Sequence, residues 1–182
     1  MGRIAAPRLG AAIAVAIGIQ AAAVMAGAMA AASAADRGQV VERSVHGAWS
    51  LACAAQQKQR CSLSQVVATD PAGKNVVLGV AVDLFDSATV PTIHFRLSAN
   101  ALREAGLGMK IDETATLRLP IGDCDKQYCQ ANGRIDDQLM ALMRAGKVIQ
   151  VAFLTAQRKQ VTVPVSLSGF DAAIDALREA SR

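Results

Sequence analysis

The chain has 182 residues, with 19 Lys and Arg against 15 Asp and Glu, and a formal net charge of +4. Hydrophobic residues make up 52% of the sequence, but aromatic residues only 3%. This charge is too close to neutral to favour a nucleic acid or an anionic membrane as the partner. The few aromatic side chains also supply no platform for stacked bases.

The first 35 residues predict a signal peptide rather than part of the fold. Arg3 and Arg8 form a basic start, an Ala-rich apolar stretch follows, and the small residues at 32–35 suit signal peptidase. The apolar stretch is long enough to span a bilayer, so an uncleaved anchor is the alternative. We expect cleavage, which leaves 147 residues with a net charge of +2 and no membrane span. That length predicts one domain in a periplasmic or otherwise exported envelope protein.

Four cysteines lie in the expected mature chain, namely Cys53, Cys61, Cys124 and Cys129. An even number in an oxidising compartment favours disulfides, and proximity favours the pairs 53–61 and 124–129, each closing a short polar loop. A Cys₄ zinc site is the alternative. Zinc sites usually join cysteines two to four residues apart, whereas these pairs enclose seven and four residues. We therefore expect two disulfides and no metal or other cofactor.

The first part of the expected mature chain combines polar and alternating segments. Residues 36–46 have no clear period and predict a flexible lead-in. Alternation of apolar and polar residues predicts strands from Trp49 to Cys53 and from Cys61 to Val67, joined as a hairpin. The stretch Val76–Phe85 is apolar almost throughout and predicts a central strand covered on both faces, with Gly79 at a bulge or a close approach.

The rest of the chain predicts more short strands and two helices. Turn signals occur at Thr69–Gly73 and Asp86–Ala88. Further strands are predicted at residues 91–98, 107–112, 115–120, after Cys129, at 148–154 and at 160–166. One helix is predicted between Asp136 and Gly146, and an amphipathic helix at Gly169–Ala180. Many short strands with few helices are typical of a mainly β sandwich or barrel.

Four separated motifs occur in one order along the chain. They are Gly47-x-Trp49-x-Leu51-x-Cys53, Arg60-Cys61-x-Leu63-Ser64-Gln65, the pair Cys124/Cys129 followed by Ala131, and Val163-Pro164-Val165-Ser166-Leu167-x-Gly169-Phe170. This set resembles the invasion-associated locus B family of exported bacterial proteins. The resemblance implies one immunoglobulin-like β-sandwich domain over residues 47–180 in a Gram-negative cell envelope. It also implies a family link to host-cell invasion and virulence, with no established catalytic residues.

The residues that could carry chemistry have simpler structural interpretations. His46 lies at the edge of the expected lead-in, His94 is expected on the solvated face of a strand, and no Gly-x-Ser-x-Gly motif accompanies them. The paired acids Asp112-Glu113 and Asp136-Asp137 suit a turn and a helix cap better than a glycosidase site. We therefore predict no catalytic residue.

Two further groups are also expected to be structural. Asp123-Cys124-Asp125 lacks the dense oxygen spacing of a calcium loop, so a charged rim on a disulfide loop is expected. Trp49 is expected to pack in the core rather than stack on a ligand.

These observations favour a non-enzymatic exported protein that binds an unidentified envelope or host protein through a sandwich face or a disulfide loop. The alternatives are an exported hydrolase and a structural component, both acting on the cell envelope. A deep pocket with converging polar groups would indicate an enzyme, whereas a shallow exposed apolar patch would indicate a binding protein.

Overall fold

A computed structural model describes residues 40–54, 57–68, 76–84, 90–113 and 115–182. All of them belong to one compact unit, Asp36–Arg182. The expected signal peptide and the turns predicted at Thr69–Gly73 and Asp86–Ala88 lie outside the described residues.

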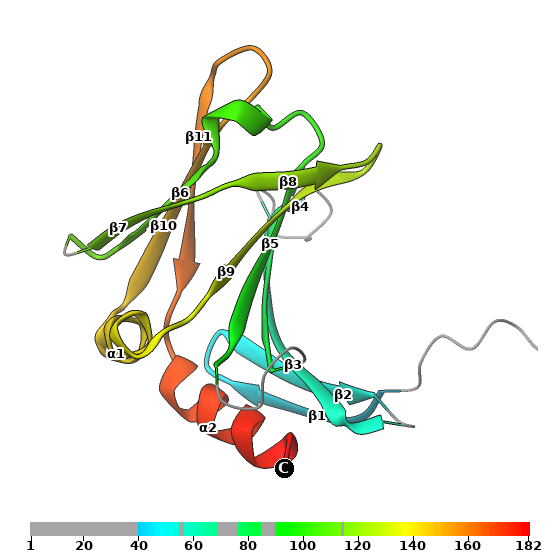
Figure 1. Cartoon of the computed structure of the whole chain (residues 1–182). Coiled ribbons are helices and arrows are strands. Elements are labelled where there is room, and N and C mark those ends of the chain that lie inside the picture. Colours follow the sequence, from blue (N-terminus) through cyan, green and yellow to red (C-terminus); the bar gives the residue numbers. More distant parts are fainter. Residues whose placement is uncertain (1–39, 55–56, 69–75, 85–89, 114) are drawn as a thin grey trace, which may run out of the picture. The chain divides into compact units, whose positions relative to one another are not determined.

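Two antiparallel sheets form the unit (Figure 1). The seven-stranded sheet contains, in spatial order, β1 (Val40–His46), β2 (Trp49–Ala54), β3 (Gln57–Ala68), β4 (Val76–Asp83), β5 (Thr92–Ser98), β9 (Tyr128–Arg134) and β8 (Ile121–Cys124). The four-stranded sheet contains β11 (Gln160–Ser166), β10 (Val148–Leu154), β6 (Leu107–Ile111) and β7 (Ala115–Leu119). A 3-10 turn, η1 (Arg103–Ala105), precedes β6.

Helices α1 (Asp137–Ala145) and α2 (Phe170–Ala180) complete the unit. The Asp136 carboxylate caps α1 by accepting a hydrogen bond from the Leu139 backbone N–H at 2.8 Å. Helix α2 lies against β2 and β3 (Figure 1) and buries the apolar face predicted for it. Among the described residues, no helix is both long and apolar enough to cross a membrane. The predicted fold class, a mainly β sandwich with two helices, is confirmed.

The alternating strands face one core. In β5 the side chains of Ile93, Phe95 and Leu97 are buried, while Thr92 and Arg96 point to the opposite face. Buried side chains from both sheets and both helices form a single hydrophobic cluster. The seven-stranded sheet therefore has an inner face on this core and an outer face turned away from it.

Two predictions about the first strands are wrong. The part of the expected lead-in that the structure describes is folded, because Val40–His46 forms β1 and pairs with β2. Strand β4 is central, as predicted, but only one of its faces is covered, because Gly79 and Ala81 on the outer face remain partly exposed. Gly79 lies in regular register and not at a bulge.

Candidate functional site

Residues from three of the four sequence motifs meet at a junction between the two sheets. The side-chain amide of Gln65 on β3 donates to the backbone carbonyl of Ser166 on β11, and the backbone N–H of Ser166 donates back to the amide oxygen, each at 3.0 Å. The Trp49 indole N–H donates to the same carbonyl at 3.0 Å. Gln65 thus forms with the backbone of β11 the pair of hydrogen bonds that a neighbouring strand would form.

A backbone contact between two glycines extends this junction. Gly47 and Gly169 both have positive φ, and the Ala48 backbone N–H donates to the Ser168 carbonyl at 3.0 Å. A Cβ on Gly47 would overlap the Ser168 carbonyl, and one on Gly169 would overlap the His46 carbonyl. Only glycine fits these two positions, so this motif serves the fold.

Trp49 is a core residue, as expected. Its side chain is fully buried and packs edge-on against Phe170 with ring centroids 5.2 Å apart. This geometry is favourable for an aromatic pair. It leaves the indole ring no exposed face for a ligand.

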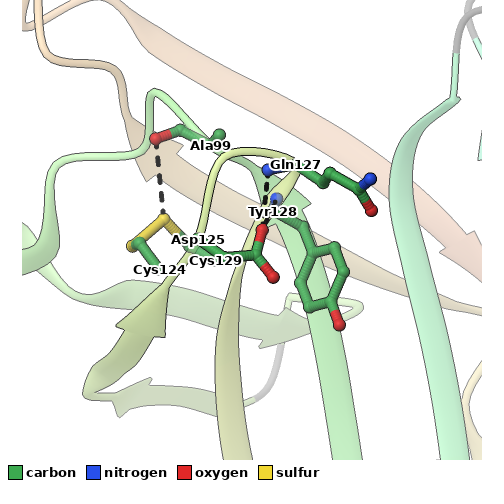
Figure 2. The surroundings of a disulfide bond; sticks show 6 residues. All are labelled: Ala99, Cys124, Asp125, Gln127, Tyr128 and Cys129. Carbon is green, nitrogen blue, oxygen red and sulfur yellow. Dashed lines mark hydrogen bonds between the residues drawn. A yellow bond between two sulfur atoms is a disulfide. The ribbon is translucent and has the colours of Figure 1, made fainter.

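Both disulfides are present in the expected pairing, so the cysteines form no zinc site. Cys53–Cys61 joins directly opposed residues of β2 and β3, and both residues are buried. Cys124–Cys129 joins β8 to β9, with Cys124 half-buried. The Ala99 carbonyl lies 3.8 Å from Cys129 Sγ (Figure 2), a packing contact because a disulfide sulfur carries no proton.

Asp125 shapes the loop between the second pair of cysteines. Its carboxylate accepts hydrogen bonds from the backbone N–H groups of Tyr128 at 2.9 Å and Gln127 at 2.6 Å (Figure 2). These two bonds, that of Tyr128 foremost, lower the pKa of the Asp125 carboxyl. The charged rim predicted for this loop is therefore a turn that binds its own backbone.

The other predicted acid pair has the same character. Asp112 has a positive φ of 42°, and its carboxylate accepts hydrogen bonds from the backbone N–H groups of Val148 at 3.0 Å and Lys147 at 3.1 Å. Glu113 pairs with Lys110 on the surface. These carboxylates hold a turn, as the sequence indicated.

The two histidines lie at places that sequence reasoning described incompletely. His46 ends β1, and its Nε2 lies 3.0 Å from the Ser44 hydroxyl oxygen. We did not expect this contact, because His46 was predicted at the edge of a flexible segment. His94 is on the outer face of β5, but it is only partly solvated, because its Nε2 lies 3.0 Å from the Asp83 carboxylate and its Nδ1 2.9 Å from the Asn132 side-chain oxygen.

This histidine borders a groove of about 500 Å³ on the outer face of the seven-stranded sheet. Strands β3, β4, β5 and β9 line it, and Gly79 and Ala81 give β4 a low profile between longer neighbours. The polar side chains at the groove are Ser62, Ser64, Asp83, His94, Arg96 and Gln130. Asp83 contributes a carboxylate whose side chain is only 8% exposed.

The outer face also carries exposed apolar side chains on the β1–β3 side of the groove. Val45 is opposite Ser50, which is opposite Ser64, so all three share this face. Val45 is 68% exposed and Val66, two residues beyond Ser64, is 63% exposed. We call the part of the sheet around Val45, Ser50 and Val66 the valine face.

Residues that are far apart in the sequence meet around His94 at the edge of the groove. Asp83, His94 and Asn132 come from three strands, and only the pairing of β4 with β5 and of β5 with β9 brings them together. The outer alternation of β5 was a usable signal for His94. No local pattern marked Asp83 or Asn132.

Comparisons with known proteins agree with the fold. The family model described as invasion associated locus B (IalB) protein matches residues 49–178. A crystal structure of invasion associated protein B from Bartonella henselae is similar, with a TM-score of 0.66 and 24% sequence identity, covering 75% of this chain and 95% of that chain. No curated protein matches the sequence.

Proposed function

The chain belongs to the invasion associated locus B family, and on this premise we propose that it is an exported, non-enzymatic accessory factor that binds an envelope or host protein. The observation that carries this proposal is the valine face. Large apolar side chains that stay exposed beside small polar ones indicate an interaction surface more than a catalytic centre.

Two features support export to an oxidising compartment. The sequence begins with a basic segment, an apolar segment and small residues at 32–35. The folded unit carries two disulfides, which persist outside the cytosol. Mass spectrometry of the protein from exporting cells is expected to find an N-terminus at Ala35 or Asp36. A mature protein that still begins at Met1 or Gly2 would contradict cleavage.

The groove supports binding more than catalysis. A general base needs a free ring nitrogen directed at a nucleophile or substrate. Both ring nitrogens of His94 are instead in contact with Asp83 and Asn132. His94 therefore orients its neighbours and does not act as a base. The groove is then a polar binding surface.

Photo-crosslinking in exporting cells tests the protein partner. Benzoylphenylalanine at Ser50, inside the valine face, is expected to give a protein adduct. The control position is Thr162, an exposed residue on the outer side of β11 in the other sheet. Equal adducts from both positions, or none from Ser50, would contradict the proposal.

One contact favours the second candidate function, an exported hydrolase. Ser44 and His46 lie within hydrogen-bond reach at 3.0 Å, the distance expected for a nucleophile and its base. A fluorophosphonate probe, which labels activated serines, separates the two functions. The binding proposal expects no label on Ser44, whereas label that is lost in His46→Ala would establish the hydrolase.

A further inference from the structure

Strand β1 forms one edge of the seven-stranded sheet, and part of its backbone points away from that sheet. Its only strand neighbour among the described residues is β2. A two-residue loop, Gly47–Ala48, joins the two strands, so His46 exchanges backbone hydrogen bonds with β2, and Ser44 does the same by alternation. The N–H and C=O groups of Arg43 and Val45 therefore face outward from the edge.

The other sheet edges in the described part of the chain are protected against pairing with a further strand. On β11, Pro164 has no N–H, and Gln65 binds both backbone groups of Ser166. Strand β8 has only four residues and an irregular register with β9. Strand β7 packs against β9 of the other sheet. Strand β1, in contrast, contains no proline and pairs in regular register from Glu42 to His46, so it is the edge best suited to accept a strand.

The two faces of β1 differ in chemistry. Ser44 and His46 are half-buried on the inner face, where helix α2 contacts β1. Arg43 and Val45 are exposed on the outer face. No acid within the described residues forms an ion pair with Arg43. A segment added beside β1 would thus meet a cation and an apolar side chain on its outer face, roughly 7 Å apart.

The occupant that satisfies this edge is an extended polypeptide, because its backbone presents donors and acceptors at the spacing of the outward groups of β1. We propose that a segment of the partner protein joins the sheet as a further strand beside β1, with an acidic residue opposite Arg43 and an apolar residue opposite Val45. Opposite charges and apolar side chains at directly opposed positions stabilise a strand pair. This inference rests on the proposed function, since it names the form of the partner at the β1 side of the valine face.

A second copy of this chain fits the edge less well. Residues that lie opposite each other in an antiparallel pair share a face, so Arg43 would meet an odd-numbered residue of the β1 region of the copy. The candidates there are Val41, Arg43, Val45 and Gly47, none of which is acidic. The register that places Arg43 opposite itself is destabilising, because like charges then face each other. The charge of this edge therefore favours a different protein.

The test uses synthetic peptides and amide hydrogen exchange measured by NMR. The protein is isotope-labelled and purified from cells that export the full chain. The first probe is a blocked nonapeptide in which Thr alternates with Val and the central Val is replaced by Glu. Its counterpart carries Lys in place of Glu. Two further forms of the Glu peptide carry N-methyl groups on the odd or on the even residues, so that each lacks the backbone donors of one edge.

Strand addition predicts a distinct pattern of protection. The amides of Arg43 and Val45 are expected to exchange more slowly when the Glu peptide is bound, because they gain acceptors. The amide of Ser44 is expected to change little, since β2 already binds it. One N-methylated peptide is expected to lose binding and the other to retain it, because only one edge of the peptide faces β1.

A charge exchange tests the residue opposite Arg43. The wild type is expected to bind the Glu peptide about threefold more tightly than the Lys peptide, and Arg43→Glu is expected to reverse that preference. Arg118→Glu, at an exposed position of β7 in the other sheet, is the matched control and should keep the preference of the wild type.

A proline tests the backbone groups. Val45→Pro removes an outward N–H but leaves the hydrogen bonds of Ser44 and His46 with β2, and is expected to weaken binding of the Glu peptide about tenfold. Thr162→Pro is the control on the exposed edge strand β11, where the N–H of Ser166 also points away from β10. Thermal melts check that both variants fold, and Arg43→Glu decides the question if Val45→Pro does not.

Four outcomes overturn the assignment. They are unchanged exchange at Arg43 and Val45 with every peptide, equal binding of both N-methylated forms, equal binding of the Glu and Lys peptides, and protection of these amides in the concentrated protein alone, which would assign the edge to a second copy. Any of these results together with a protein adduct from Ser50 would leave the proposed partner intact without strand addition. Protection by the Glu peptide without that adduct would leave strand addition intact and contradict the proposed function.

Discussion

The sheet junction and the outer face of the seven-stranded sheet share strand β3 but serve different purposes. At the junction, Trp49 and Gln65 converge on the backbone of Ser166, and Gly47 and Gly169 bring two loops into contact. All five residues belong to the motifs on which the family resemblance rests. The outer face carries Val66 and the groove, where few motif residues lie. The resemblance therefore identifies the fold, while the binding surface must be read from the structure.

The largest expected effect on stability comes from replacing a glycine of the junction. Gly169→Ala places a methyl group against the His46 carbonyl at a positive φ, and should lower the free energy of unfolding by more than about 3 kcal/mol. Urea denaturation measures it. Gly108→Ala, which has ordinary contacts and no positive φ, is the control. Equal stability of the two variants would show that the loops can separate without cost.

Removing the disulfides should have the next largest effect. Replacing Cys53 and Cys61 by Ala should cost about 2–3 kcal/mol, because a cross-link restricts the unfolded chain. Replacing Cys124 and Cys129 should cost less, since that bridge closes a separation of five residues instead of eight. Thermal melts of the two double variants give the order, and non-reduced peptide mapping checks the pairing. Crossed peptides would contradict the pairing.

Removing the amide at the junction should have an intermediate effect. Gln65→Leu loses two hydrogen bonds to Ser166. It leaves the Ser166 backbone N–H without the side-chain oxygen that accepted its hydrogen bond. We expect a loss of about 2 kcal/mol in the free energy of unfolding. Ser64→Ala, one residue earlier on the outer face, should change stability far less. If Gln65→Leu and Ser64→Ala had the same stability, Gln65 would not join the sheets.

The smallest effect concerns Asp125 and depends on pH. Its folded pKa is lowered by hydrogen bonds from Tyr128 and Gln127, so the stabilisation is present above the unfolded pKa, about 4, and is lost as the pH falls through the folded pKa. Asp125→Asn should thus melt lower than the wild type at pH 7, with the difference shrinking below about pH 4. A difference independent of pH would show that the charge is irrelevant.

Sequence patterns predicted the elements whose two faces differ. Strand β5 was visible because Ile93, Phe95 and Leu97 alternate with polar residues, and α1 because Asp136 is a good cap. Strand β1 was missed because Glu42, Arg43 and Ser44 interrupt its apolar residues, as an edge strand tolerates. Strand β8 was missed because it has only four residues.

The candidate sites were less predictable than the fold. The apolar run of β4 suggested cover on both faces, but Gly79 and Ala81 are too small to require it and form a groove instead. The cluster of Asp83, His94 and Asn132 depends on the register of three strands. Register is set by long-range packing, which no local period records.

The most direct test compares two consecutive residues on opposite faces of β3, Gln65 and Val66. Unfolding free energy and the photo-adduct from Ser50 are measured for Gln65→Leu and Val66→Glu. We expect Gln65→Leu to lose about 2 kcal/mol in the free energy of unfolding, while its folded fraction still forms the adduct. Val66→Glu should stay within about 1 kcal/mol of the wild type and lose the adduct. An adduct that survives in Val66→Glu, or disappears in folded Gln65→Leu, would contradict the division between the junction and the outer face.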